Sequence, residues 1–160
     1  MGISQSQPAQ EPEPEPETKE SEAKVTFYPI PFFTSIPGGL QPSRVVIISC
    51  TLLPNAERFH INLCAGTNIA FHQNPRLSEK TVVRNSKIKG AWGSVEKSLP
   101  VRMPFIAGHS FKVAIICKAQ CYRVTVNGQH LLVYAHRLKD LRTISHLEVD
   151  GDIVLADVQV

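Results

Sequence analysis

The chain has 160 residues, of which 42% are apolar, and this length and composition fit one globular domain with a tail. The formal net charge of +3 is uneven, because residues 1–24 carry six Glu and two Lys (net −4) whereas residues 25–160 carry 15 Lys or Arg and eight Asp or Glu (net +7). No apolar run has the length of a membrane-spanning helix, and no apolar N-terminal segment typical of a secretory signal is visible.

Residues 1–26 are predicted to form a disordered tail rich in Glu and Pro. Residues 11–17 alternate the two types, and proline blocks both helices and sheet ladders while the like charges repel one another. We therefore expect a solvated spacer in polyproline II conformation. Residues 1–6 also fit the pattern for N-myristoylation of Gly2, and a single acyl chain there would give only weak membrane contact.

From residue 29 onward the pattern is one of short strands separated by turn signals. Asn127-Gly128 joins two apolar runs and predicts a two-residue hairpin, because both residue types tolerate a positive φ. A single helical turn is expected at residues 137–141. Together these features predict an all-β, antiparallel β-sandwich over residues 27–160. The expected strands are residues 45–52, 59–64, 69–73, 81–88, 110–117, 122–126, 130–135, 145–149 and 153–158.

Polar side chains recur with strand periodicity between residues 72 and 76. His72, Asn74 and Arg76 alternate, so on an extended strand they share one face. Ile69 and Phe71 have the opposite parity and are expected to face the core. This pattern predicts a strand with one wet face and one buried face.

A second polar run and an aromatic ring follow close behind. Val83 and Asn85 repeat the alternation on the next strand, and Trp92, the only Trp in the chain, lies in a segment containing Gly90 and Gly93 that favours exposure. Amide, imidazole and guanidinium groups beside an exposed ring suit a sugar, because polar groups bind hydroxyls and the ring covers the apolar face of a pyranose.

These motifs resemble those of the galectin family, which are H-x-N-P-R, V-x-N and W-x-x-E-x-R in this order. The resemblance extends from residue 31 to 160, includes flanking phrases at residues 58–62, 82–85, 104–105 and 126–130, and is greatest to the C-terminal carbohydrate-recognition domain of two-domain galectins. It implies a jelly-roll of two sheets and a non-enzymatic lectin that binds β-galactosides without a metal or cofactor. Galectins occur in the cytoplasm and also outside the cell after export without a signal peptide, so both locations are expected.

The resemblance also implies the role of each candidate residue. His72, Asn74 and Arg76 would bind the axial 4-hydroxyl of galactose, Asn85 would contact the 6-hydroxyl, and Trp92 would stack on the hexose. A glucose epimer would leave such polar groups unpaired, which explains a preference for galactose. The full candidate set is His72, Asn74, Arg76, Val83, Asn85, Trp92 and Lys97.

One position departs from the family pattern. Val95 stands where the family has its carboxylate, Lys97 replaces the final Arg, and Glu96 has the wrong strand parity to substitute. Losing a charge-assisted hydrogen bond costs about 1.5–3 kcal/mol, or roughly ten- to 150-fold in affinity. We therefore predict weakened or altered galactoside binding. The alternative is a galectin-related protein without lectin activity that acts through protein–protein contacts, including a homodimer through sheet edges.

Other chemistries find little support in the sequence. The cysteines are expected to be reduced thiols, with Cys117 in the core and Cys121 exposed and oxidisable, and no zinc-type spacing occurs. No nucleophile, carboxylate pair or Ser-His-Asp arrangement accompanies His72, which argues against catalysis. The basic residues are scattered, so we expect no nucleic-acid partner.

Overall fold

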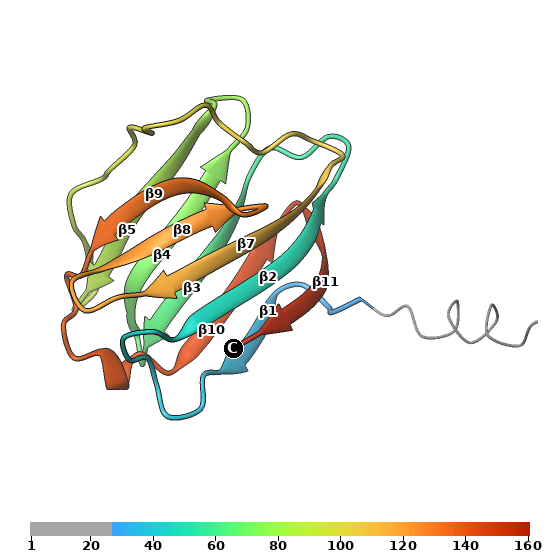
Figure 1. Ribbon diagram of the computed structural model, residues 1–160. Helices are drawn as coiled ribbons and strands as arrows, with labels where there is room; N and C mark the ends of the chain where they lie inside the picture. Colours follow the sequence, from blue (N-terminus) through green and yellow to red (C-terminus); the bar gives the residue numbers. More distant parts are fainter. Residues whose placement is uncertain (1–26) are drawn as a thin grey trace, which may run out of the picture.

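The computed structural model describes residues 27–160, which form two antiparallel β-sheets packed face to face (Figure 1). One sheet has six strands in the order β1-β10-β3-β4-β5-β6, and the other has five in the order β11-β2-β7-β8-β9. The predicted all-β, antiparallel sandwich is confirmed, while the expected tail and Gly2 lie outside the described residues. The strands are β1 (Phe32–Ser35), β2 (Val45–Leu52), β3 (Phe59–Ala65), β4 (Asn68–Arg76), β5 (Thr81–Ile88), β6 (Ala91–Trp92), β7 (Ser110–Cys117), β8 (Cys121–Val126), β9 (Gln129–Ala135), β10 (His146–Gly151) and β11 (Ile153–Gln159).

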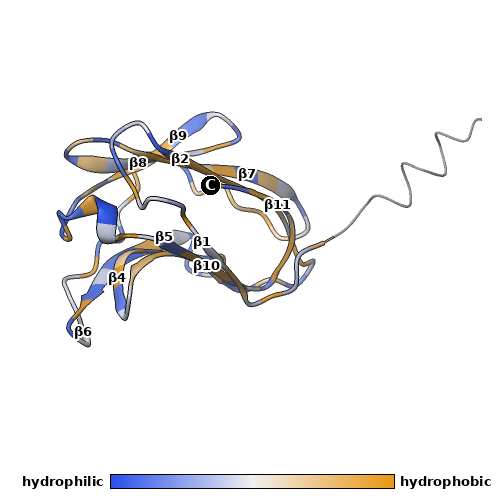
Figure 2. Cartoon of the chain, turned by 90° about the horizontal axis from the view of Figure 1, so that it is seen from below, coloured by the Kyte–Doolittle hydropathy of each residue, from blue (hydrophilic) through white to orange (hydrophobic). Residues whose placement is uncertain are grey.

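Alternating apolar residues create the core between the two sheets, which Figure 2 shows edge-on as two layers. Along β2, Val46, Ile48, Cys50 and Leu52 are buried, and the residues between them are at least partly exposed. This period of two is what a strand requires when one face packs and the other is solvated.

Two short strands at the edges of the six-stranded sheet escape prediction from sequence. β1 pairs with β10, and β6 is a two-residue pairing of Ala91 and Trp92 with Ile88 and Lys87 of β5. Such short segments carry too few residues to show periodicity. The helical turn expected at residues 137–141 is wrong, because the only 3-10 turn among the described residues comprises Leu141–Thr143.

A β-bulge in β4 corrects the predicted facing of Ile69. In the pairing of β3 with β4, Leu63 is opposite Phe71 and Cys64 is opposite Ile69, so Ala70 is the extra residue. Ala70 and Phe71 are therefore both in the core, whereas Ile69 lines a cavity at the surface. The expectation that Ile69 shares the core face with Phe71 is wrong, but the alternation from Phe71 onward holds.

The predicted hairpin at Asn127-Gly128 is confirmed. The two residues have φ values of 51° and 80°, as a two-residue turn between β8 and β9 requires. Asn127 also accepts a hydrogen bond from the Lys112 amide through its side-chain oxygen, at 2.8 Å, which attaches the turn to β7.

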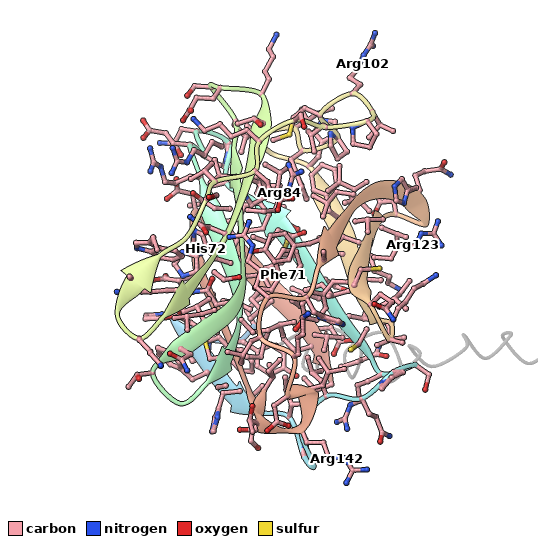
Figure 3. All side chains as sticks on the ribbon, turned by 90° about the vertical axis from the view of Figure 1, so that its left-hand side faces the viewer. Phe71, His72, Arg84, Arg102, Arg123 and Arg142 are labelled. Carbon is pink, nitrogen blue, oxygen red and sulfur yellow. The ribbon has the colours of Figure 1, made fainter. Side chains whose placement is uncertain are left out.

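Aromatic packing anchors β4 to the opposite sheet. The buried Phe71 ring stacks between Tyr122 and Tyr134, with centroid distances of 4.9 and 4.6 Å. The Tyr134 hydroxyl lies 2.6 Å from Ser86 Oγ on β5. Figure 3 shows Phe71 between the sheets and His72 on the outer side of the six-stranded sheet, so core packing fixes the strand that carries the candidate site.

All four cysteines are unpaired, Cys117 is buried as predicted, and Cys121 is half-buried rather than exposed. Burial raises the pKa of the Cys50 thiol to about 12, which makes it inert at neutral pH. Within residues 27–160, no helix is long and apolar enough to cross a membrane.

Candidate functional site

The predicted polar residues meet on the outer face of the six-stranded sheet, where β4 pairs with β5. His72 is opposite Asn85 and Asn74 is opposite Val83 in this antiparallel pairing. Residues that are cross-strand partners place their side chains on the same face about 5 Å apart. Two predicted strands thus bring together side chains that the sequence separates by 9 to 13 positions.

A shallow cavity of about 410 Å³ lies over this face and is here called the Trp92 pocket. Five predicted site residues line it: His72, Arg76, Val83, Asn85 and Trp92. Gly93 and Val95 complete its wall. Asn74 and Lys97, the other two candidates, do not line it.

A chain of hydrogen bonds fixes the imidazole of His72. Asn62 Nδ2 donates to Glu148 Oε1 at 2.7 Å, so its amide oxygen faces His72, where Nδ1 lies 2.6 Å away. A carboxylate only accepts, and an amide oxygen likewise only accepts, so His72 Nδ1 must carry the proton. Nε2 is then the unprotonated nitrogen and is the acceptor that His72 offers to a ligand.

The surroundings of His72 keep it neutral. Burial, followed by the nearby His60 and Arg76, lowers its pKa from 6.5 to about 4. The His72 ring also lies 4.9 Å from the Trp92 ring, centroid to centroid. At neutral pH the residue therefore acts as a hydrogen-bond acceptor rather than as a cation.

Asn74 holds Arg76 in place from beneath the pocket. Asn74 is only 5% exposed, donates to the Phe59 carbonyl at 2.7 Å, and accepts from Arg76 Nε at 2.9 Å. Arg76 Nη1 lies 3.5 Å from Glu79 Oε2. The guanidinium thus has one firm partner, Asn74, and one carboxylate, Glu79, at longer range.

The amide of Asn85 is almost fully engaged within the protein. Its oxygen accepts from the Ser86 amide at 2.7 Å and from Arg137 Nη1 at 2.9 Å, and its nitrogen donates to the Gly93 carbonyl at 2.9 Å. An amide nitrogen has two hydrogens, so one N–H of Asn85 is left for a ligand. Asn85 can therefore donate to a sugar hydroxyl but has no free acceptor.

Arg137 ties Asn85, which lines the pocket, to the segment that follows Trp92. Besides Asn85, it donates to the Ser94 carbonyl and to Glu96 Oε2, both at 2.8 Å. Glu96 therefore faces Arg137 and not the pocket, consistent with its predicted opposite parity. A Cβ at Gly93 would lie 2.9 Å from Arg137 Nη1, so a larger residue there would make the end of the Arg137 side chain shift.

Trp92 and Val95 form the exposed rim of the pocket. They are 48% and 51% exposed, which confirms the predicted exposure of the lone Trp. The Val95 side chain offers no hydrogen bond to the pocket that it lines with Arg76. Lys97, two residues on, is exposed, and its carbonyl accepts from Thr81 Oγ1 at 2.7 Å.

Taken together, the Trp92 pocket presents one acceptor, two donors and a ring. His72 Nε2 accepts, Arg76 and Asn85 donate, and Trp92 offers an apolar face. One hydroxyl can donate to an imidazole and accept from a guanidinium at once, which suits a fixed polyol such as a sugar.

Sequence reasoning missed the residues that position this set. Three of them contact a pocket residue directly, namely Asn62, Arg137 and Glu79, whereas Glu148 acts through Asn62. All four belong to other strands, turns or loops. Their parity could not reveal them, because they act through partners rather than by lining the pocket. Periodicity along β3 would have placed Asn62 on the same face as His60, and this is the one available signal.

A larger cavity of about 830 Å³ lies at one end of the sandwich, near Leu77, Arg102 and Phe105. Its walls are mainly apolar, and no hydrogen-bonded cluster converges on it. We therefore assign the functional site by chemistry, to the smaller pocket. Within residues 27–160, no group of three or more His, Cys, Asp or Glu side chains is arranged to hold a metal ion.

Comparison with known proteins supports the family resemblance seen in the sequence motifs. A family model described as galactoside-binding lectin matches residues 31–160. Human galectin-4 is 41% identical over 134 residues, covering 82% of this chain, and rat galectin-8 is 42% identical over 132 residues, covering 81%. Because those matches cover 41% and 42% of the relatives, the chain spans about two fifths of their length.

Solved structures agree with the fold. Sheep galectin-11, in complex with glycerol, superposes with a TM-score of 0.73 at 29% identity, covering 82% of this chain and 98% of that one. Galectin LEC-6 of Caenorhabditis elegans superposes with a TM-score of 0.74 at 23% identity, covering 84% and 95%, which supports the fold alone.

Proposed function

The chain belongs to the family of galactoside-binding lectins, the galectins, and from this membership we propose that it binds a galactose-containing glycan in the Trp92 pocket. The observation that carries the proposal is that His72, Arg76 and Asn85 converge beside an exposed Trp92 with one acceptor and two donors free. Binding requires no metal and no bond-breaking step, so the proposed role is recognition and not catalysis.

In the proposed complex an axial hydroxyl lies between His72 and Arg76. It donates to Nε2 of His72 and accepts from the guanidinium of Arg76, while Asn85 donates to the exocyclic hydroxyl and Trp92 covers the C–H face of the ring. Asn74 holds Arg76 from below. An equatorial hydroxyl would leave His72 and Arg76 without these partners, which favours galactose over glucose.

We infer that Val95 weakens or changes this recognition. A carboxylate at this position would reach both the sugar and Arg76, and without it the loss corresponds to roughly ten- to 150-fold in affinity. Val95 also favours the second candidate function, a galectin-fold protein that acts through protein contacts alone. A homodimer through sheet edges would give either candidate two sites, and sedimentation tests it. By family resemblance the proposed location is the cytoplasm, with export as a further option.

Titration calorimetry with lactose and N-acetyllactosamine tests the proposal, comparing the native chain with Val95→Glu and Trp92→Ala. A working lectin binds in native form, more tightly with Val95→Glu and not measurably with Trp92→Ala. Binding gained only by Val95→Glu supports the second candidate. Absence of binding in all three chains contradicts the assignment of the pocket to galactosides.

A further inference from the structure

The larger cavity at the end of the sandwich, here called the Phe105 cavity, combines an apolar lining with unpaired positive charge. It measures about 830 Å³, and most of its lining is apolar: Ala56, Leu77, Met103, Phe105, Ile106 and Ala107. Among the described residues, Lys80 and Arg102 are the charged ones that line it, and no acidic residue does. Neither cation forms an ion pair within residues 27–160. The cavity therefore suits a ligand that carries both carboxylates and apolar groups.

One wall of the Phe105 cavity is rigid and another is open to solvent. Phe105 is 4% exposed and packs edge-to-face on Phe59 and Phe111, with centroid distances of 5.3 and 5.2 Å. Ile106, the next residue, is 53% exposed. Core packing thus fixes the position of an apolar side chain that an incoming ligand would cover.

The acidic residues adjoining this lining in sequence do not neutralise its cations. Glu79, which precedes Lys80, lies 3.5 Å from Arg76 Nη1. Glu57 follows a cavity residue but forms no ion pair with either cation. Lys80 and Arg102 are thus free to bind carboxylates that come from outside the described residues.

An acidic, proline-rich segment belongs to this same chain. Residues 11–17 contain four Glu and three Pro in strict alternation. Residues 1–24 carry a net charge of −4 and residues 25–160 a net charge of +7, so the two parts attract each other. The carboxylates match the two cations, and proline rings match the apolar lining. Proline also restricts the backbone, so such a segment loses little conformational entropy on binding.

The described chain begins close enough for this segment to reach the Phe105 cavity. The Tyr28 amide donates to the carbonyl of Leu155 on β11 at 3.0 Å. Three residues before Leu155, a distance of about 10 Å along a strand, the Asp152 carboxylate accepts from the loop that contains Ala56. Ala56 lines the cavity. The ten residue steps from residue 17 to residue 27 span up to about 35 Å when extended, which exceeds this path.

We propose that residues 11–17 dock in the Phe105 cavity of their own chain, with Glu side chains at Lys80 and Arg102 and proline rings on the apolar lining. The inference goes beyond the proposed galactoside function and does not depend on it, because this cavity shares no residue with the Trp92 pocket.

Met103 provides a spectroscopic probe within the cavity. The chain has two methionines, Met1 and Met103, so methyl labelling of methionine gives one signal from the described residues. In the full chain this signal should move in a four-Gln variant, which combines Glu11→Gln, Glu13→Gln, Glu15→Gln and Glu17→Gln. Raising the salt concentration from about 0.05 M to about 0.5 M should move the native signal towards that of the variant, because exposed charges are screened. A signal that fails to move in either comparison overturns the proposal.

A peptide of residues 8–20 tests whether the segment that fills the cavity comes from the same chain. It should move the Met103 signal of the four-Gln variant towards the native position. The native chain should bind the peptide at least about twofold more weakly than the variant, because its own tethered segment has an effective concentration on the order of 1 mM. Equal affinity for the two chains assigns the cavity to a segment of another molecule and overturns the proposal.

Two arginines at opposite ends of the molecule locate the contact (Figure 3). Both Arg102 and Arg142 are exposed. Added to the four-Gln variant, Arg102→Gln should weaken binding of the peptide about fivefold, the effect of losing one exposed ion pair, and Arg142→Gln should leave it unchanged. An equal effect of the two substitutions means that the peptide responds to net charge alone, and this outcome overturns the assignment to the Phe105 cavity.

Discussion

Asn62 determines which nitrogen of His72 faces the Trp92 pocket. Its amide oxygen lies 2.6 Å from Nδ1 because its amide nitrogen is committed to Glu148 at 2.7 Å. Three residues from three strands, β3, β4 and β10, thus set one hydrogen-bonding role. A change at Asn62 or Glu148 should therefore alter the protonation of the His72 ring, although Glu148 does not line the pocket.

Glu148→Gln should weaken sugar binding several-fold without unfolding the domain. A Gln amide can donate as well as accept, so Asn62 is free to flip and no longer fixes the proton on Nδ1. Nitrogen chemical shifts of the His72 ring report the tautomer directly. Glu57→Gln, a change at an exposed loop residue, is the control and should alter neither the shifts nor the affinity.

Binding should be constant from pH 8 to about pH 5.5 and should fall as His72 protonates near its pKa of about 4. Protonation removes the Nε2 acceptor and places a cation beside Arg76 and His60. The unfolded chain binds this proton near the ordinary value of 6.5, so the contribution of His72 to stability is complete above pH 6.5. It is lost as the pH falls from 6.5 to 4. A loss of affinity already at pH 6.5 would contradict the neutral assignment.

Arg137→Met should lower affinity about tenfold and shift the fluorescence of Trp92. The change removes the donors to Asn85 and Ser94 and leaves Glu96 without its partner, so the segment that carries Trp92 is less well held. Since Trp92 is the only Trp, its emission reports this segment alone. Arg142→Met is the matched control, because Arg142 is exposed and points away from the sandwich (Figure 3). An equal loss of sugar affinity in both variants would contradict a specific role of Arg137 in holding Asn85 and the segment that follows Trp92.

Gln73→Leu should stabilise the domain by about 1–3 kcal/mol. Gln73 is fully buried, and neither polar atom of its amide has a hydrogen-bond partner among the described residues. Leucine has a similar volume and removes that cost. Urea denaturation gives the free energy of unfolding, and lactose affinity should not change, because Gln73 faces away from the pocket. A destabilised variant would mean that the amide has a partner, such as a buried water.

Most of the fold could be predicted because its strands alternate strictly. β2, β5 and β7 match their expected bounds, and the hairpin at Asn127-Gly128 follows from two residue types that tolerate a positive φ. The bulge at Ala70 could not be predicted, because an extra residue in one strand is a property of the pairing and not of the strand itself. For the same reason the facing of Ile69 is reversed.

The site was predictable only in part. Five predicted residues line the pocket, whereas Asn74 is beneath it and Lys97 is outside its wall; the five are His72, Arg76, Val83, Asn85 and Trp92. Asn62, Glu148 and Arg137 come from β3, β10 and the segment after β9, so only the folded chain brings them to the pocket. Side chains that act through a neighbour leave no spacing pattern along the sequence.

Because β6 pairs with β5 through only two residues, the two sides of the pocket should differ in the rate at which their backbone amides exchange with solvent. His72 and Asn85 lie on inner strands whose amides should exchange with solvent only when the whole domain opens. Trp92 is on an edge held by two residues, so its amide should exchange through local fraying. A bound sugar that contacts both walls would slow exchange mainly at β6. Hydrogen exchange would thus detect a bound ligand as slower amide exchange in β6.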